Sequence, residues 1–373
     1  MEVFRHIAYA KAGRFQEPVL LPLSEGEKEP GMPCACPQRP FRLGFLMGEP
    51  EPYHLTEDCQ SLNIWTPSRT GKYPVLVWIH GGAYVAGTGE ASSYDGEVLC
   101  RQGDIVVVTL SYRLGIWGYL YSPEDGIVNL GLKDQITALR WVKRNIARFG
   151  GDPDRITVAG QSAGGHSVAS IIGACAEPLF HRAILQSAPL GIRCSRKTGE
   201  KLHRIAVRCS AGKPLAELGT EELLDVQRSV LSRSGSMMAY SPIEADFSGN
   251  VAVPSLRKVL VTWQKDDASP FVAMKFRHSK ILTWAATRIV FSAPAKRYAR
   301  ALQRSGIVTA LRCLDWRPDG SRFGACHCLE MCLLLGKWER WQGAGMLGRV
   351  QRAEWEERGA RLREEWLSFV KED

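Results

Sequence analysis

The hydrophobic residues of this chain fall first into short unbroken runs rather than into alternating ones. Residues 75–79 (VLVWI) and 105–110 (IVVVTL) are continuous apolar segments rich in β-branched side chains. Runs of this kind are typical of strands buried on both faces of a parallel sheet. Further strands are predicted at residues 155–160 (RITVAG), near the end of 179–188 (LFHRAILQSA), and at 259–263 (VLVTW).

Between the second and third of these runs, the apolar spacing changes to that of a helix. Residues 134–149 (DQITALRWVKRNIARF) carry a broad apolar face, and the sequence Gly-Gly-Asp-Pro at 150–153 ends it. Strand, helix and strand at this spacing predict an α/β fold with a mostly parallel central sheet.

The remaining segments give weaker signals. Residues 16–56 are predicted to be loop-rich because prolines, including Pro30 and Pro33, interrupt them. Residues 193–249 have the pattern of polar helices and turns, and helices are expected to dominate from Trp284 onward. The last helix is expected to dock on the body of the protein through Leu362, Trp366 and Phe369.

Composition narrows the class of protein. The chain has 373 residues, of which 45% are hydrophobic and 23% charged, which excludes a disordered or collagen-like protein. No apolar stretch approaches the length of a membrane-spanning helix, and the start lacks the pattern of a signal peptide. We therefore expect a cytoplasmic protein without membrane insertion, in which most of the eleven cysteines are free thiols.

Charge leaves one alternative open. The 48 basic and 39 acidic residues give a net charge of +9, which permits a nucleic-acid or acidic-surface partner. The basic residues are scattered, with only a loose cluster between Arg193 and Lys213, and no basic and aromatic motif accompanies them. A solvated basic face is the preferred interpretation, so no nucleic-acid partner is expected.

The first motif with chemical content is Gly160-Gln161-Ser162-Ala163-Gly164. It follows a predicted strand and opens a predicted helix, as a nucleophile elbow does. In such a turn the serine side chain projects above the sheet edge, and the helix start supplies oriented N–H groups. Ser162 is therefore the candidate nucleophile.

A second glycine-rich loop, His80-Gly81-Gly82-Ala83-Tyr84, follows the strand at 75–79. Esterases carry the oxyanion-binding loop at this place, so the N–H groups of Gly82, Ala83 and Ala163 are the candidate oxyanion donors. The alternative is an ordinary glycine-rich turn, which two hydrolase loops in the proper order make improbable.

Further segments resemble the type-B carboxylesterase, or carboxylesterase/cholinesterase, family of α/β-hydrolases. Residues 57–64 (EDCQSLNI) are similar to its EDCLxLN signature, and SYRLG, GLKDQ, FGGDP and GQSAGG follow in the family's order. The start, FRHIAYAKAGRF, resembles the family's N-terminal segment. This resemblance implies an α/β-hydrolase fold.

The resemblance also implies the other triad members, in the chain order Ser, acid, His. His327 lies in a segment similar to the family's G-x-x-H-x-x-E and is the expected general base, with His278 as the alternative. Asp267, in VLVTWQKDDA, falls on the acid position, and a solvated loop is the alternative interpretation of residues 265–267. A zinc site on Cys326, His327, Cys328 and Cys332 is disfavoured because alternating ligands converge poorly on one tetrahedron.

Some matching residues are implied to be structural. Arg14 with Glu57, and Arg113 with Asp134, fall where the family forms buried ion pairs. Cys59 matches a cysteine that secreted relatives pair with an upstream one, here Cys34 or Cys36, and the expected compartment argues against that bond.

The sequence thus predicts one α/β-hydrolase domain over residues 1–373 with a reduced helical cap at 188–256. The expected activity is hydrolysis of small-molecule carboxylic esters by Ser162, Asp267 and His327, without cofactor or metal. A non-catalytic binding protein of the same fold is the alternative. Oligomeric state is not readable from the sequence.

Overall fold

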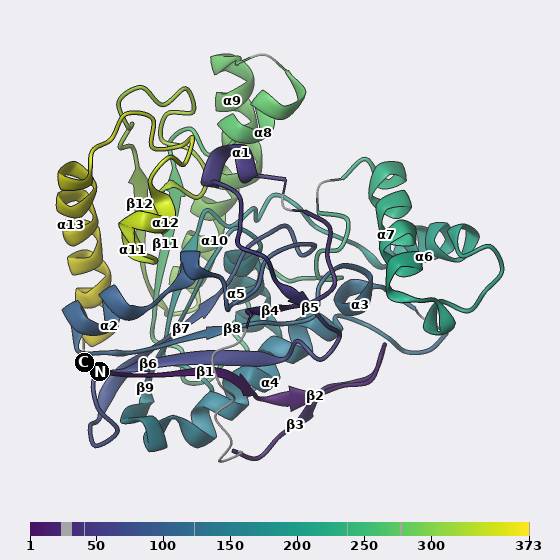
Figure 1. The fold of residues 1–373 in the computed structure, drawn as a ribbon, viewed down its shortest axis with the longest axis horizontal. Helices are drawn as coiled ribbons and strands as arrows, with labels where there is room; N and C mark the ends of the chain where they lie inside the picture. The colour runs from purple at the N-terminus through teal and green to yellow at the C-terminus, as the bar shows by residue number, and fades with distance from the viewer. Residues whose placement is uncertain (24–31, 41, 123, 237, 277, 373) are drawn as a thin grey trace.

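A twisted sheet of eight strands forms the centre of the computed structural model, which describes residues 1–23, 32–40, 42–122, 124–236, 238–276 and 278–372 (Figure 1). The strand order is β1-β6-β8-β7-β9-β10-β11-β12. The β1–β6 and β6–β8 pairs are antiparallel, and every other pair in this sheet is parallel. Their bounds are β1 (Glu2–Ala8), β6 (Ser61–Thr66), β7 (Tyr73–Ile79), β8 (Val106–Leu110), β9 (Gly151–Gln161), β10 (Arg182–Gln186), β11 (Lys258–Gln264) and β12 (Val308–Leu314).

Two small pairs of strands lie outside this sheet: β2 (Ala10–Lys11) with β3 (Val19–Leu20), and β4 (Cys34–Ala35) with β5 (His54–Leu55). The five strands expected from apolar runs are all present. The mostly parallel α/β architecture that they imply is confirmed.

Helices cover both faces of the sheet. Side chains of β7 alternate between two cores, with Val75 and Val77 in one and Leu76 and Trp78 in the other. The first core includes side chains of α4, α5 and α10, and the second those of α2, α11 and α13. The helices are α1 (Gly44–Met47), α2 (Glu97–Gly103), α3 (Gly115–Tyr119), α4 (Leu130–Asn145), α5 (Ala163–Ala174), α6 (Arg196–Cys209), α7 (Thr220–Ser234), α8 (Ser269–Lys275), α9 (Lys280–Thr287), α10 (Ala293–Arg304), α11 (Leu329–Leu334), α12 (Trp338–Trp341) and α13 (Arg352–Lys371).

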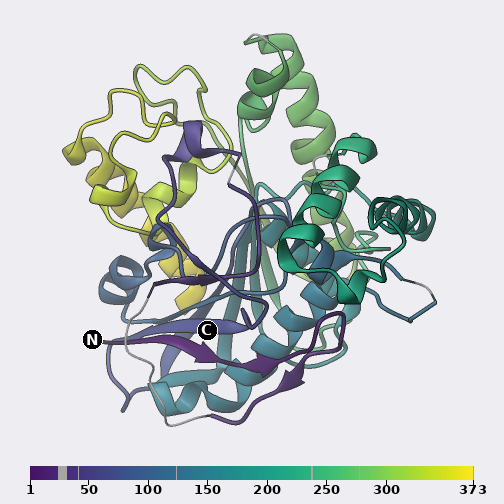
Figure 2. The ribbon, with the colours of Figure 1, turned by 45° about the vertical axis from the view of Figure 1, so that its right-hand side comes forward.

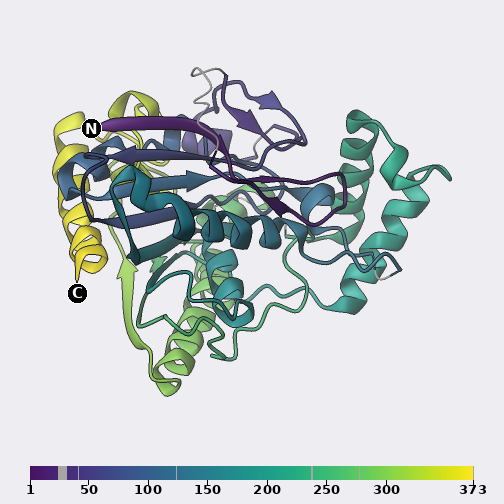
Figure 3. The ribbon, with the colours of Figure 1, turned by 90° about the horizontal axis from the view of Figure 1, so that it is seen from below.

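Short 3-10 turns occur at η1 (Ser92–Tyr94), η2 (Ile146–Phe149) and η3 (Leu215–Glu217), and a π-helical turn, η4 (Arg288–Ser292), links α9 to α10. The pair α6 and α7 stands away from the sheet layers when the molecule is seen from below (Figure 3). Helix α13 docks as expected, with Trp366 and Phe369 buried.

Three strands of the central sheet, β1, β6 and β12, were not expected from the sequence. Helices were expected beyond Trp284, yet β12 forms there and pairs parallel with β11. It is an edge strand whose residues are only partly buried, so it has no continuous apolar run. Strand β1 is likewise an edge and was not expected. Pro30, part of the predicted loop-rich stretch, lies outside the described residues.

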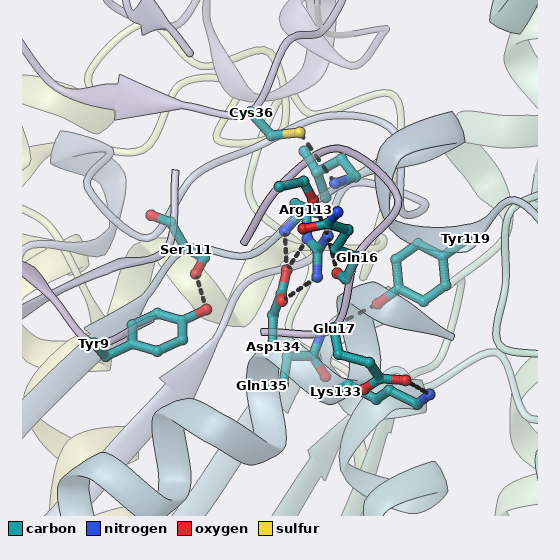
Figure 4. A network of polar contacts seen from close by, with 12 residues as sticks. Tyr9, Gln16, Glu17, Cys36, Ser111, Arg113, Tyr119, Lys133, Asp134 and Gln135 are labelled. Carbon is teal, nitrogen blue, oxygen red and sulfur yellow. Dashed lines mark hydrogen bonds and ion pairs between the residues drawn. The ribbon is translucent and has the colours of Figure 1, made fainter. Parts of the chain in front are cut away.

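A buried ion pair joins the loop after β8 to helix α4 (Figure 4). Asp134 accepts hydrogen bonds from Nε and Nη2 of Arg113 at 2.8 and 2.7 Å, and both side chains are buried. Arg14 and Glu57 also pair, but both remain about a quarter exposed. Only the first of the two expected pairs is therefore fully buried.

The buried thiols of Cys36 and Cys59 are neighbours near that network (Figure 4). Cys36 Sγ accepts a hydrogen bond from the N–H of Leu114 at 3.2 Å. A hydrogen bond to Cys36, together with burial, raises the pKa of the Cys59 thiol well above its ordinary value. In this structure the two cysteines are free thiols.

Candidate active site

Ser162 occupies a strained turn between β9 and α5. Its backbone angles are φ 56° and ψ −122°, a conformation that residues other than glycine rarely adopt. The flanking glycines allow this tight packing: a Cβ on Gly164 would lie 2.0 Å from the carbonyl oxygen of Ile79, and one on Gly160 would lie 2.4 Å from the carbonyl carbon of Gly164. The expected elbow geometry is present.

The loop at residues 80–84 lies directly against the serine. A Cβ on Gly81 would approach Cβ of Ser162 to 3.1 Å. Gly82 and Ala83 both have positive φ, and the carbonyl of Gly82 accepts the N–H groups of the next turn. Within the described residues the N–H groups of Gly82 and Ala83 donate to no protein acceptor, so they are available to an oxyanion.

His327 and Asp267 form a buried pair. Nδ1 of His327 lies 2.6 Å from Oδ1 of Asp267, and both side chains are almost fully buried. The other carboxylate oxygen, Oδ2, accepts the N–H of Gln264 at 2.9 Å. Burial lowers the pKa of His327, but the Cys328 thiol and the Asp267 carboxylate outweigh burial and raise it well above its ordinary value.

A residue of the elbow itself, Gln161, contacts the opposite side of the imidazole. Its amide Nε2 lies 3.2 Å from Nε2 of His327 and 3.3 Å from Sγ of Cys328. When the imidazole is neutral and carries its proton on Nδ1 toward Asp267, its Nε2 can accept a hydrogen bond from this amide. This is the tautomer that a general base needs, and Gln161 had not been assigned any role from the sequence.

The other candidates lie elsewhere. Asp266 points away from Asp267, with its carboxylate bound to the guanidinium of Arg317 at 3.0 and 3.1 Å and to the N–H of Ala325 at 3.1 Å. His278 is exposed and lies edge-on against Phe323. Neither residue takes part in the cluster around Ser162.

Glu330, three residues beyond His327 in the first turn of α11, adds a second buried carboxyl group. It accepts a hydrogen bond from Nε2 of Gln264 at 2.5 Å. Burial, together with the nearby Asp267 carboxylate, raises the pKa of Glu330 to about 7. Below that pH, Glu330 is mostly protonated and adds little negative charge beside Asp267 and the imidazole.

A pocket of about 300 Å³ opens over these residues. Ser162, His327, Gly82 and Ala83 all line it, and its walls are mainly apolar. Helix α7 and the segment after it contribute Leu224, Leu231 and Met238, whereas the segment after β11 contributes Phe271, Met274, Ala286, Val290 and Phe291. Both groups lie within residues 188–320, the region that sequence reasoning expected to supply the pocket walls, but only the first belongs to the predicted cap.

One group of possible metal ligands occurs elsewhere among the described residues. Ligand atoms of His6, Cys34 and Glu90 lie within 4.8 Å of one another. Glu90 already accepts hydrogen bonds from the ring of His6 at 2.7 Å, from the Ser61 hydroxyl and from the N–H of Cys34. These contacts satisfy the carboxylate without an ion.

Comparisons with known proteins give a consistent assignment. Residues 1–314 match the Carboxylesterase family. The probable N-octanoylanthranilate hydrolase AqdA2 of Rhodococcus erythropolis is 37% identical over 411 aligned positions, covering 99% of this chain and 88% of that protein. The para-nitrobenzyl esterase of Bacillus subtilis is 49% identical over 137 residues, covering 35% of this chain and 28% of that protein.

Solved structures agree over the whole chain. A thermophilic PNB esterase superposes with a TM-score of 0.85 at 26% identity, covering 99% of this chain and 87% of that one. The carboxylesterase EST55 of Geobacillus stearothermophilus gives a TM-score of 0.79 at 28% identity, with 99% and 87% covered. None of the helices described here is long and apolar enough to cross a membrane.

Proposed function

Because this chain belongs to the carboxylesterase family and is a carboxylic ester hydrolase, we propose that it cleaves small esters through an acyl-enzyme formed on Ser162. His327 takes the hydroxyl proton as Oγ attacks the ester carbonyl. It then gives that proton to the departing alcohol. Water, activated by the same histidine, attacks the acyl-enzyme and releases the carboxylic acid.

Asp267 acts on the imidazole rather than on the substrate. Its hydrogen bond to Nδ1 fixes the tautomer and stabilises the imidazolium that forms in each half-reaction. Ser162 Oγ makes no hydrogen bond among the described residues, and Nε2 of His327 faces the Gln161 amide. Catalytic hydrogen bonds are often loose without substrate, so we expect the serine hydroxyl to replace this amide when an ester binds.

The N–H groups of Gly82, Ala83 and Ala163 hold the negative oxygen of the tetrahedral intermediate. Removing one such donor typically raises the barrier by about 3 to 4 kcal/mol. The backbone of Gly81 lies so near Ser162 that an added Cβ would approach Cβ of the serine to 3.1 Å, and Ala163 is the first residue of α5, where an N–H has no partner within the helix. We therefore expect these donors to be available before the reaction begins.

The pocket favours a small, largely apolar ester. Its volume of about 300 Å³ is at the lower end for ligand sites. The name of AqdA2 describes an octanoyl substrate, and an apolar acyl chain suits the side chains that line this pocket. We propose that residues 188–256 act as a reduced cap on a single domain over 1–373, since α7 supplies part of the pocket wall.

One observation carries the proposal. His327, which is paired with the buried Asp267, lines the same pocket as the strained Ser162. Labelling with a fluorophosphonate probe and burst kinetics with p-nitrophenyl esters of increasing acyl length test it. Ser162→Ala should lose the label and several orders of magnitude in rate. Ser187→Ala is the matched control, because Ser187 also follows a parallel strand with positive φ.

Retention of the rate in Ser162→Ala would refute the assignment of the nucleophile. A folded wild type that neither reacts with the probe nor turns over any ester would instead indicate a non-catalytic binding protein.

A further inference from the structure

Residues 268–314 have a charge pattern unlike that of the rest of the chain. They contain nine lysines and arginines and no aspartate or glutamate. The charge of this segment alone therefore equals the net charge of the whole chain, +9. The basic residues are spaced rather than clustered, so they do not form a charge run. The structure shows where part of this charge lies.

Helices α8 and α9 form a hairpin that projects beyond the body of the protein (Figures 1 and 2). Large apolar side chains on and beside it face solvent: Ile281 is 77% exposed, Ile289 68% and Trp284 64%. Phe276, between the two helices, is also exposed. Singly exposed apolar side chains are ordinary, but several on one short projecting hairpin mark an interaction surface.

Cationic side chains accompany these apolar ones. Lys275, Lys280 and Arg288 are exposed, and within the described residues none of the three pairs with a carboxylate. Arg288 lies over the ring of Trp284 at 5.8 Å. An apolar surface bordered by unpaired cations is the composition of a helix that lies in the interface of an anionic membrane.

The same hairpin forms one wall of the pocket. Phe271 and Met274 of α8 and Ala286 of α9 line it, and Val290 and Phe291 follow in η4. A surface that bound the outer face of this hairpin would therefore lie beside the entrance to the pocket.

We propose that the hairpin of α8, α9 and η4 docks on anionic phospholipid surfaces and thereby presents the pocket to esters held in the lipid phase. The docking itself does not depend on the proposed function. The delivery of esters from the lipid to the pocket does rest on the proposed function. The apolar tips enter the headgroup region, and the lysines and arginine contact lipid phosphates. A second copy of the chain is a poor occupant, because a two-fold contact would oppose two surfaces of the same positive charge.

Cosedimentation with vesicles tests the docking. The full chain carrying Ser162→Ala is used so that no lipid is hydrolysed. Vesicles of phosphatidylcholine with about one third phosphatidylglycerol are compared with phosphatidylcholine alone, at low and high salt. We expect binding to the anionic vesicles only, decreasing as salt rises, because surface charges are screened.

Matched variants locate the surface. Ile281→Glu should abolish binding, whereas Val19→Glu, at a side chain 66% exposed on β3, should not. Lys280→Glu with Arg288→Glu should weaken binding by about 25-fold or more, since each basic residue near an anionic surface contributes roughly a factor of five. Lys197→Glu with Arg204→Glu, on exposed positions of α6, changes the net charge equally and should have little effect.

Equal binding to both kinds of vesicle, or equal losses in hairpin and control variants, would overturn the proposal. A wild-type dimer in sedimentation velocity that Ile281→Glu converts to monomer would also overturn it, in favour of a second copy. In the Ser162-containing protein, each hairpin variant should hydrolyse a soluble p-nitrophenyl ester as the wild type does. If the wild type hydrolysed no ester but still bound the anionic vesicles, the proposed function would be refuted and the docking would stand.

Discussion

Replacing Asp267 by Asn tests the triad more sharply than removing the carboxyl group, because the shape of the side chain is kept. In the native structure Oδ2 accepts the N–H of Gln264 and Oδ1 faces Nδ1 of His327. An asparagine must present its oxygen to the N–H of Gln264, so its NH₂ group would face the histidine. Two donors would then oppose each other unless the ring proton moved to Nε2.

The expected loss follows from this exchange of tautomers. With its proton on Nε2, His327 cannot accept the proton of Ser162, and no negative charge stabilises the imidazolium. The same substitution in a serine-protease triad lowers turnover about 10⁴-fold. That factor corresponds to about 5.5 kcal/mol in the barrier.

Asp266→Asn is the control, because it makes the same carboxylate-to-amide replacement at the neighbouring residue. Asp266 contacts Arg317 and the N–H of Ala325 but not His327. We expect less than about a tenfold loss in turnover and a loss of unfolding free energy of about 1 kcal/mol. Initial rates with a p-nitrophenyl ester, near-ultraviolet circular dichroism and urea unfolding measure both variants. Equal losses of turnover in the two, with both folded, would refute the role given to Asp267.

Three further predictions concern buried groups. Burial raises the pKa of Glu330 from 4.5 to about 7, so the folded protein holds this proton more tightly than the unfolded chain, and the unfolding free energy should fall by about 3 kcal/mol between those two pH values. Glu330→Gln should lack this decrease in urea unfolding across the same range, and parallel pH profiles would contradict the effect. Arg113→Met should lower the unfolding free energy by about 3 to 5 kcal/mol by stranding Asp134, whereas Arg14→Met, at the pair that is about a quarter exposed, should lower it by less than about 1 kcal/mol; thermal or urea unfolding that ranks them the other way would refute this. In a thiol titration without reductant, most of the eleven cysteines should react after denaturation, while Cys59 and Cys332 should react slowly in the native protein because burial helps to raise their pKa; two or fewer reactive thiols after denaturation would exclude it.

The parts of the fold that the sequence predicts well are those dictated by local rules. Strands β7 and β8 are buried and consist of nearly continuous apolar runs, which are visible without any knowledge of tertiary structure. Strand β6 is equally buried but carries Ser61, Asn63 and Thr66, so no such run marks it. The elbow is equally local, because its strain requires small residues at fixed distances from Ser162. Edge strands follow no such rule. β12 pairs with only one neighbour and is partly exposed, so its sequence does not have to distinguish it from a helix.

The contacts that complete the candidate site are long-range, and no local pattern encodes them. Gln161 meets His327 across 166 residues, and Gln264 meets Glu330 across 66. A resemblance to a family can point to the histidine and the acid, but the side chains that orient them depend on how separate loops pack. The cationic apolar hairpin was missed for another reason: its defining feature is the absence of acidic residues, which a search for clustered positive charge does not detect.

The pair Asp266–Asp267 explains how an aspartate reaches the histidine. Its side chain is one methylene shorter than that of a glutamate, so the loop that carries it must lie close to the loop that carries His327. Asp266 provides that closeness: its N–H donates to the carbonyl of Ala325 at 2.8 Å, and its carboxylate accepts the N–H of Ala325 in return. The two loops are thus joined two residues before His327, and Asp267 needs only to turn inward. One carboxylate joins the loops and the other orients the base, which is why the two substitutions should affect stability and turnover so differently.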